Sequence, residues 1–326
     1  YDENLHAGGG VISPLRGPKK SRRSQRSVAV VTALLLTTLA VTIVANLFWQ
    51  QQVQVRSIEN QRLQLQQQWV LRGALDWARL ILREDARTSA LDTLAEPWAT
   101  PLAPTRLDQY VQSGTVRGEA GSAVLSGFIQ DAQGRFNLTN LATHGEINPA
   151  EVQAFARLLT LLKQDPGLAS SIAQFIAQAG LAALNPRPDA VRPISFVQLD
   201  DLLVVPGCTP RVISILQPYI IILPNNTTVN INTASPEVLA ASIAGLSIAD
   251  ANTLINSRRQ AAIRDLGDLA ARLSNRTLSF DGGRLGVASS FFIVRGNIAI
   301  RHTALQIDAL VERKPNTTRL VWVREI

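Results

Sequence analysis

The sequence predicts an α+β fold, in which a long N-terminal helix packs on a small antiparallel sheet and a large all-α domain is inserted between the strands. Three observations predict it. An uncharged run at 28–48 continues into a helical pattern that reaches residue 87. Strand patterns occur at 115–141 and again at 291–323. The intervening block, roughly 143–288, has helical spacing, and strands on both sides of a helical block indicate one domain interrupted by another.

Composition and charge narrow the class of protein. The chain has 326 residues, of which 46% are hydrophobic and 17% charged, and this excludes a wholly disordered or collagen-like protein. The single cysteine, Cys208, excludes an intramolecular disulfide framework and a zinc site built from several thiolates. Residues 1–27 hold six basic residues against two acidic ones, so +4 of the net charge of +7 lies there. The remaining +3 is spread over 299 residues and does not indicate a basic nucleic-acid groove.

The first element is a candidate membrane segment. Val28 to Phe48 is a run of 21 residues without a charge, and about 20 helical residues cross a bilayer core. The basic run at 19–23 and Arg26 precede it, so the positive-inside rule places residue 1 in the cytoplasm and the chain after Trp49 across the membrane. A cleaved secretory signal is the alternative. We expect an uncleaved anchor, because the run is longer than a typical signal's apolar region and has no clear A-x-A site.

The helical pattern continues beyond the membrane segment. From Gln50 to Arg87 there is no proline, and Gly73 is the only glycine. Apolar residues recur at spacings of three, four and seven, at Val55, Ile58, Leu65 and Trp69, then Leu71, Leu75, Ala78 and Leu82. This predicts a single 60-residue helix over 28–87 whose last third buries one face against a domain. Two helices broken near Trp49 are the alternative.

The strands follow. Val116 and residues 123–130 read as strands, and DAQG (131–134) reads as a turn, with Gly134 expected at positive φ, before a strand at 135–138. Near the C-terminus, strands are predicted at 291–300, 304–312 and 319–323, with a turn at 314–317. The apolar end of the long helix is expected to cover this sheet, because an isolated hairpin is marginally stable.

The insertion is predicted to contain two similar helix-hairpin-helix-like units, 196–220 and 229–259. The helices of the insertion, in these units and before them, have start and stop signals in the form of caps and helix-opening prolines. These signals are Asn148-Pro149, Pro206-Gly207, Thr209-Pro210, Ser235-Pro236, Gly245 and Ser247. In the second unit, the apolar faces on either side of Gly245 are expected to pack on each other.

Five stretches in this order resemble the general secretion pathway protein K family, the large minor pseudopilin of the type II secretion system. They are VAVVTALLL (28–36), LRGALDWARLILRED (71–85), DAQGRFNLTNL (131–141), FVQLDDLLVVPGCTP (196–210) and VNINTASPEVLAA (229–241). The resemblance implies the pseudopilin fold. It divides the chain into a basic cytoplasmic leader (1–27), a transmembrane segment (28–49), a head (50–142 and 289–326) and an all-α insertion (143–288).

The resemblance also implies a function and partners. It implies a non-enzymatic subunit, without a cofactor, at the tip of a periplasmic pseudopilus that takes part in the export of folded proteins across the outer membrane. The implied partners are the I-type and J-type minor pseudopilins, the pseudopilus, prepilin peptidase and the inner membrane, and no nucleic acid is expected. The residues expected to pack the helix into the fibre are Val55, Ile58, Leu65 and Trp69.

Processing by prepilin peptidase is implied between Ser27 and Val28, which would become the N-methylated first residue. Family members usually have glycine where this chain has Ser27. Most pseudopilins have glutamate at mature position five, whereas this chain has Thr32, as is typical of protein K. The stretch that corresponds to the family's acidic loop, 172–190, retains only Asp189, so no metal is expected there.

A membrane-anchored helix-hairpin-helix DNA-binding protein of the competence type is the alternative function. NINTASPEVL, followed by a hairpin and Arg258-Arg259, is the pattern of such proteins. However, the hairpin AGLSIAD (244–250) has one glycine where DNA binders usually have two, and Asp250 adds negative charge where a phosphate would lie. An enzyme is a third class. No nucleophile–base spacing supports it, and Asp200-Asp201 and His302 have structural explanations.

Overall fold

The computed structural model describes residues 22–107, 123–184, 195–273, 283–300 and 303–326. The chain divides into two units, residues 1–64 and 65–326, which are described separately below. Helix α1 (Arg22–Thr88) contributes to both units. The helix continues through Trp49, so the prediction of a single helix is confirmed and the two-helix alternative is wrong.

Residues 28–48, in the helical part of the first unit, are uncharged and exposed. They belong to the one helix, among the described residues, that is long and apolar enough to cross a bilayer. The hydroxyls of its threonines donate to carbonyl oxygens one turn earlier, as Thr37 does to Leu34 at 2.8 Å and Thr42 to Thr38 at 2.7 Å. Because these hydroxyls have acceptors within the helix, they do not prevent insertion into lipid.

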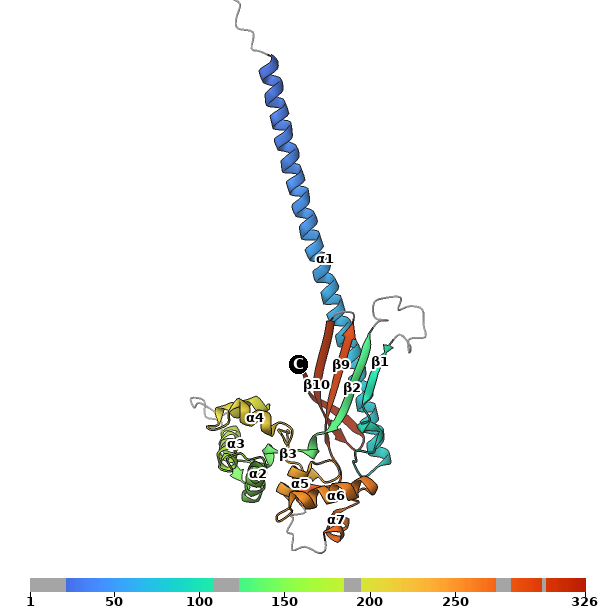
Figure 1. The fold of residues 1–326 in the computed structure, drawn as a ribbon, viewed down its shortest axis with the longest axis vertical. Helices are drawn as coiled ribbons and strands as arrows, with labels where there is room; N and C mark the ends of the chain where they lie inside the picture. Colours follow the sequence, from blue (N-terminus) through green and yellow to red (C-terminus); the bar gives the residue numbers. More distant parts are fainter. Residues whose placement is uncertain (1–21, 108–122, 185–194, 274–282, 301–302) are drawn as a thin grey trace, which may run out of the picture. The chain divides into compact units, whose positions relative to one another are not determined.

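A five-stranded antiparallel sheet forms the centre of the second unit (Figure 1). Its strands, in spatial order, are β1 (Leu102–Arg106), β2 (Val124–Asp131), β9 (Phe291–Ile300), β10 (Thr303–Lys314) and β11 (Thr317–Glu325). The four strands predicted at 123–130, 291–300, 304–312 and 319–323 are confirmed. Strand β1 was not predicted, because its sequence LAPTR contains a proline and no alternation of apolar residues. Val116 lies outside the described residues.

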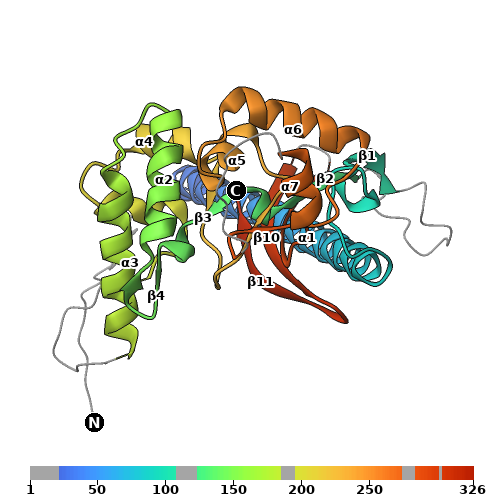
Figure 2. The same cartoon turned by 90° about the horizontal axis from the view of Figure 1, so that it is seen from below.

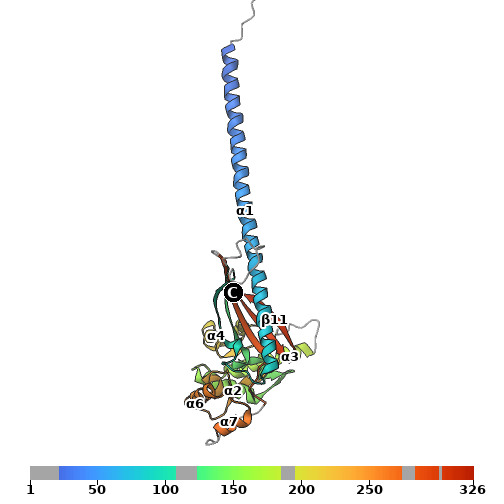
Figure 3. The same ribbon diagram turned by 90° about the vertical axis from the view of Figure 1, so that its right-hand side faces the viewer.

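The last turns of α1 cover one face of this sheet, as predicted (Figure 3). Leu71, Leu75, Ala78 and Leu82 are buried. A Cβ added to Gly296 of β9 would lie 3.2 Å from Leu71, so this glycine allows close approach of the helix to the strand. The apolar strip of the helix and the sheet therefore form one core.

The predicted turn at 131–134 and a strand after it are present, but this strand does not pair with β2. After β2 the chain makes a 3₁₀ turn (Ala132–Gly134), and the next strand, β3 (Phe136–Asn137), pairs in parallel with β6 (Ile220–Ile221) of the insertion. Gly134 does not have the positive φ expected of it. The reason is tertiary: β9 occupies the edge of β2 that a hairpin partner would need, and a contact distant in sequence captures Phe136.

The described residues of the insertion between β2 and β9 form six α-helices. They are labelled α2 to α7 in Figure 2. They are α2 (Pro149–Leu161), α3 (Leu168–Leu184), α4 (Pro210–Leu216), α5 (Pro236–Ser242), α6 (Ile248–Gln260) and α7 (Leu266–Arg272). The predicted caps are confirmed: the side chains of Asn148, Thr209, Ser235 and Ser247 accept hydrogen bonds from the first turns of their helices. Gly207 and Gly245 have positive φ at the two hairpin turns. The first helix of the first hairpin is a 3₁₀ helix, Leu199–Val204, and not an α-helix.

Short strand pairs supplement these helices. They are β3 with β6, β4 (Ala142–Thr143) with β5 (Glu146–Ile147), and β7 (Val229–Asn230) with β8 (Leu285–Gly286). Two apolar cores result. One lies among α2, α3 and α4 around Phe155, and the other among α5, α6 and α7 around Leu239. A third cluster packs Ile221 and Leu223 of the insertion on Phe291, Ile293 and Leu310 of the sheet.

Candidate functional site

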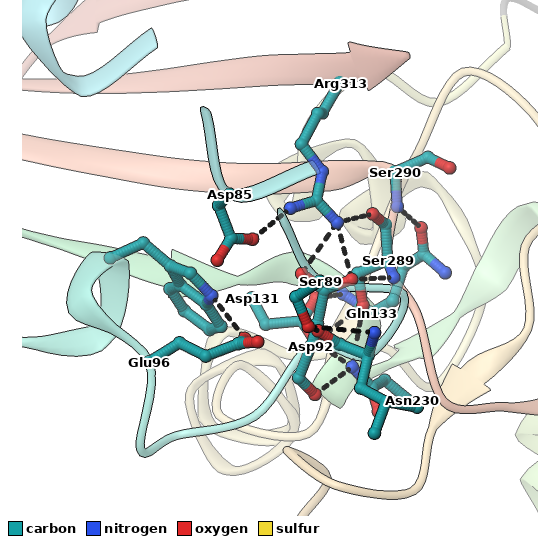
Figure 4. Close-up of polar contacts among 12 residues, drawn as sticks. Asp85, Ser89, Asp92, Glu96, Asp131, Gln133, Asn230, Ser289, Ser290 and Arg313 are labelled. Atoms are coloured by element: carbon teal, nitrogen blue, oxygen red, sulfur yellow. Dashed lines mark hydrogen bonds and ion pairs between the residues drawn. The ribbon is translucent and has the colours of Figure 1, made fainter. Parts of the chain in front are cut away.

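A buried polar cluster lies where the end of α1, the sheet and the insertion meet (Figure 4). Its centre is Arg313 of β10, whose guanidinium donates to Asp85 of α1 at 2.6 Å and to Asp92 of the following loop at 2.5 Å. The guanidinium also donates to the carbonyl oxygen of Ser289 at 2.7 Å and lies over the ring of Phe292. Arg313 therefore ties the helix, the loop and the sheet together.

Asp131, at the end of β2, is the second centre of the cluster. One carboxylate oxygen accepts from the backbone N–H of Gln133 at 2.8 Å. The other accepts from the amide of Asn230 at 2.9 Å and from the hydroxyls of Thr233 and Ser289 at 2.6 and 2.7 Å. Asn230 and Thr233 belong to the insertion. Asp131 therefore fastens the insertion to the sheet with charge-assisted hydrogen bonds, which are stronger than neutral ones.

Burial controls the ionisation of the acidic groups in this cluster. Burial raises the pKa of Asp85 to about 6, and the nearby Glu96 adds to the rise, whereas Arg313 opposes it. Burial also raises the pKa of Asp131, although Thr233 and Ser289 donate to its carboxylate. These directions follow from the free energy required to take a carboxylate out of water.

Asparagines in the same motifs close the neighbouring loops. The side chain of Asn140 pairs with both backbone groups of Thr227, accepting from the N–H at 3.0 Å and donating to the carbonyl at 2.7 Å. Asn232 pairs in the same way with Ile263, at 2.9 Å for each bond. An amide side chain that supplies both a donor and an acceptor substitutes for a neighbouring strand. These residues hold loops whose backbone groups would otherwise be buried without partners.

The motifs quoted for the family resemblance therefore meet in space. Asp85 ends the stretch 71–85, Asp131 begins 131–141, and Asn230 lies in 229–241. Sequence reasoning placed them on separate elements and did not predict their contact, and it missed Asp92 and Arg313 altogether. The available signal was weak: Glu312-Arg313 is a charged pair at the end of an otherwise apolar strand pattern. The chemistry of the cluster is that of a structural junction.

Three of the acidic groups lie close enough together to resemble a metal site. Asp85, Asp92 and Glu96 each place a carboxylate oxygen within 4.8 Å of the others. Arg313 already pairs with two of them, and the indole N–H of Trp98 donates to Glu96 at 2.9 Å. Each of the three carboxylates therefore already accepts from a donor of the protein, and a guanidinium occupies the position beside two of them, so the trio does not support a metal site. In the stretch 172–190, Ala177 and Ala179 are buried in α3, and Asp189 lies outside the described residues.

The residues that are predicted to pack the helix into the fibre are exposed in the structure. Val55 and Ile58 are exposed in the first unit, and Leu65 and Trp69 are exposed in the second. The predicted run of apolar residues along the helix is divided by the structure. In the second unit, Leu65 and Trp69 face solvent, whereas the residues from Leu71 to Leu82 that follow the spacing of four, three and four face the sheet.

The residues predicted for processing lie at the start of α1. Val28 is exposed, and the Ser27 side chain is outside the described residues. The hydroxyl of Thr32 donates to the carbonyl oxygens of Val28 and Ala29, both at 3.0 Å. Thr32 is therefore satisfied within its own helix and needs no charged partner, unlike a glutamate at this position.

One of the two arginines that suggested DNA binding is bound within the chain. The guanidinium of Arg258 donates to the carbonyl oxygens of Ile231 and Ala234, the latter at 2.7 Å, and burial lowers its pKa to about 10. Arg258 is thus committed to the loop that precedes α5, and this leaves Arg259 exposed at the end of α6. One exposed arginine is a weak phosphate site. Asp201 likewise accepts from the backbone N–H groups of Val197 and Gln198, which is a helix-capping role.

Comparisons with known proteins agree with one another. Two family models match, both described as type II secretion system (T2SS), protein K, one at residues 134–225 and the other at 229–288. The type II secretion system protein K of Pseudomonas aeruginosa is 27% identical over 94% of each chain. That of Aeromonas hydrophila is 24% identical over 94% of this chain and 98% of its own.

A solved structure has the same fold. The crystal structure of the GspK–GspI–GspJ complex from the type 2 secretion system of enterotoxigenic Escherichia coli contains a chain that matches with a TM-score of 0.63 and 20% identity. The match covers 83% of this chain and 99% of the other. The long helix, the small antiparallel sheet and the inserted helical domain are therefore a shared architecture.

Proposed function

Because the chain belongs to the type II secretion system protein K family, we propose that it is a minor pseudopilin that acts at the tip of the pseudopilus by binding, without catalysis. The observation that carries the proposal is the architecture of the second unit. The last turns of α1 cover a five-stranded sheet that a helical insertion interrupts between β2 and β9, and the motifs of the family form the junction between sheet and insertion. The insertion is bulky, and this favours the tip over a place within a regular fibre.

The proposed topology follows the charge pattern. Residues 1–27 are a cytoplasmic leader, 28–49 cross the inner membrane, and the remainder lies in the periplasm. The head comprises 50–142 and 289–326, and the insertion comprises 143–288. The apolar, exposed helix and the preceding basic residues support this arrangement.

The proposed partners are the I-type and J-type minor pseudopilins, because the solved relative with the same fold is a GspK–GspI–GspJ complex. Prepilin peptidase is proposed to cut between Ser27 and Val28 and to leave an N-methylated Val28. Mass spectrometry of the mature protein tests this step. A mature N-terminus at Val28 is expected, and a chain that still carries residues 1–27 would contradict the proposed processing.

Secretion and co-purification test the function. A strain that lacks this chain should lose export of its folded exoproteins and regain it when the wild-type chain is supplied. The wild-type chain, tagged and purified from solubilised membranes, should recover both partner pseudopilins. Normal export in the deletion strain would overturn the proposal.

A single substitution tests the predicted packing residues. Trp69→Asp should weaken recovery of the partners about tenfold or more, because exposed tryptophans contribute strongly to interfaces and a buried unpaired carboxylate is unfavourable. Leu203→Asp is the matched control, since Leu203 is also exposed but lies in the insertion. Equal recovery with both variants would show that Trp69 is not at the interface.

A further inference from the structure

No contact among the described residues explains the glycine at position 73. It lies in the interior of α1, where glycine is less stable than alanine, and its φ is that of an ordinary helix. A Cβ added to Gly73 would meet no atom of the described residues within 4 Å. Other glycines of the second unit are explained by close packing or positive φ, as Gly296 and Gly245 are. Gly73 is instead open to solvent.

Large apolar side chains surround Gly73 on the exposed face of the helix. Trp69 lies one turn before it and Trp77 one turn after it, at a spacing of four residues each, and Leu80 follows three residues later. Their exposed fractions are 69%, 51% and 49%. We call Trp69, Gly73, Trp77 and Leu80 the tryptophan–glycine face. Two exposed indoles separated by a residue without a side chain form a notch on the helix surface.

An apolar groove adjoins this face. It has a volume of about 360 Å³ and lies between α1 and the segment that leads into β1. Trp77 lines it on the helix side, and Trp98 and Leu102 line it on the other side. Paired glycines, Gly127 of β2 and Gly296 of β9, form part of its lining, so the lack of side chains there leaves the space open. Trp77 thus links the notch to a groove of the size that accommodates a large apolar side chain.

Exposed arginines beside the tryptophan–glycine face indicate the charge of the partner that would bind there. Arg72 and Arg83 are exposed along one flank, and neither has an ion pair within the described residues, whereas Arg79 pairs with Asp76 at 2.9 Å. The flank is therefore basic overall. A helix that carries bulky aliphatic side chains on one side and carboxylates beside them is complementary to this surface.

Resting on the proposed function, we propose that a helix of another minor pseudopilin crosses α1 at Gly73, with a large aliphatic side chain seated between Trp69 and Trp77. Glycine at position 73 is then required for the contact with the partner and not for the fold of the chain. Its missing side chain lets the two helix backbones approach closely, as small residues do at other helix crossings. The two tryptophans supply the buried aromatic contact area. Arg72 and Arg83 face carboxylates of the partner.

Substitution of Gly73 separates this interface from the stability of the chain. Full-length chain is co-expressed with the I-type and J-type pseudopilins, purified from membranes in mild detergent, and the recovered partners are quantified. Gly73→Leu should reduce recovery of at least one partner tenfold or more, and Gly73→Ala should reduce it by a smaller factor. Asn256→Leu, which adds a leucine at an exposed position of α6, is the matched control and should leave recovery unchanged.

Thermal unfolding of the variant without partners completes the design. Because the added Cβ of Gly73→Ala meets no atom of the described residues within 4 Å, the unfolding temperature of this variant should equal or exceed that of the wild type. A lower temperature would reveal an intramolecular role for Gly73 and overturn the proposal. If the wild type recovers the partners and Gly73→Leu recovers them equally, the proposal fails and the proposed function stands. If the wild type recovers neither partner, both fail.

A photo-reactive amino acid in place of Asp76, which is exposed beside the face, identifies the occupant. Cross-linking in intact cells to an I-type or J-type pseudopilin supports the proposal. Cross-linking to a second copy of this chain, or no cross-link to any pseudopilin, would overturn it.

Discussion

Residues 65–88 of α1 have two apolar faces, of which one is buried and the other is exposed. Leu71, Leu75, Ala78 and Leu82 are buried against the sheet, and the Asp85 side chain below them pairs with Arg313. The tryptophan–glycine face on the other side also carries large apolar side chains, but it is exposed. Hydrophobicity alone therefore does not distinguish a core face from a docking face. The two faces differ because the sheet packs on one of them, whereas no described element of the chain covers the other.

The largest loss of stability is expected for the buried face, at the ion pair between Asp85 and Arg313. Arg313→Ala should reduce the free energy of unfolding by about 3–5 kcal/mol, because it leaves Asp85 and Asp92 buried without their cation. Arg319→Ala is the matched control. Arg319 pairs with Glu312 at 2.8 Å but is two-thirds exposed, so its loss should change stability by about 1 kcal/mol or less. Urea unfolding of the full chain in mild detergent, followed by tryptophan fluorescence, measures both. Similar losses for the two variants would contradict the structural role of the cluster.

Truncation of leucines on the two faces gives the next largest contrast. Leu82 is fully buried, so Leu82→Ala should destabilise the chain by about 2–5 kcal/mol. Leu80, two residues earlier on the tryptophan–glycine face, is half-exposed, and Leu80→Ala should change stability by about 0.5 kcal/mol or less. The same unfolding measurement applies. A large loss for Leu80→Ala would show that its face is covered within the chain.

Stability should also depend on pH through the buried face. The folded-state pKa of Asp85 is raised from 3.8 to about 6, so the folded chain binds more protons than the unfolded chain between these values. Stability therefore falls as the pH rises from about 4 to about 6, and the raised pKa of Asp131 acts in the same direction. Asp85→Asn should flatten this slope in unfolding measurements across the same range. An unchanged slope would show that Asp85 does not titrate there.

The smallest expected effect concerns the exposed face and has the opposite sign. Gly73→Ala should stabilise the isolated chain by about 0.5–1 kcal/mol, because alanine is the better helix former and its Cβ meets no atom. This gain is measured by the same urea titration. A substitution that stabilises the chain and weakens partner recovery would show that folding and partner binding depend on different faces of the same helix.

Local sequence signals predicted much of the secondary structure. Asn148, Thr209, Ser235 and Ser247 cap the helices they were expected to cap, and the strands from β2 to β11 in the main sheet follow their alternation or apolar runs. Such signals act over a few residues, so they do not depend on the rest of the fold. The strand predicted after residue 134 is present, but local signals did not identify its partner, which is a segment about 80 residues away.

The candidate sites show the same division. Asp85, Asp131 and Asn230 stood in motifs that the resemblance singled out, but their convergence on one cluster with Arg313 depends on sheet order and on the docking of the insertion. The apolar residues from Val55 to Leu82 read as one stripe in the sequence. Their division into a buried face and an exposed face depends on the position of the sheet, which the sequence of the helix does not contain.

The sequence by itself determined the elements that depend on local chemistry: the uncharged apolar segment, the uninterrupted helix, the capped helices of the insertion and the strand pattern. Tertiary structure alone decided which apolar face of α1 is buried, which edge of β2 is paired, and which charges are brought together out of water. The physical reason is that helix periodicity and capping are set by near neighbours, whereas burial and buried ion pairs are set by contacts between residues far apart in the chain.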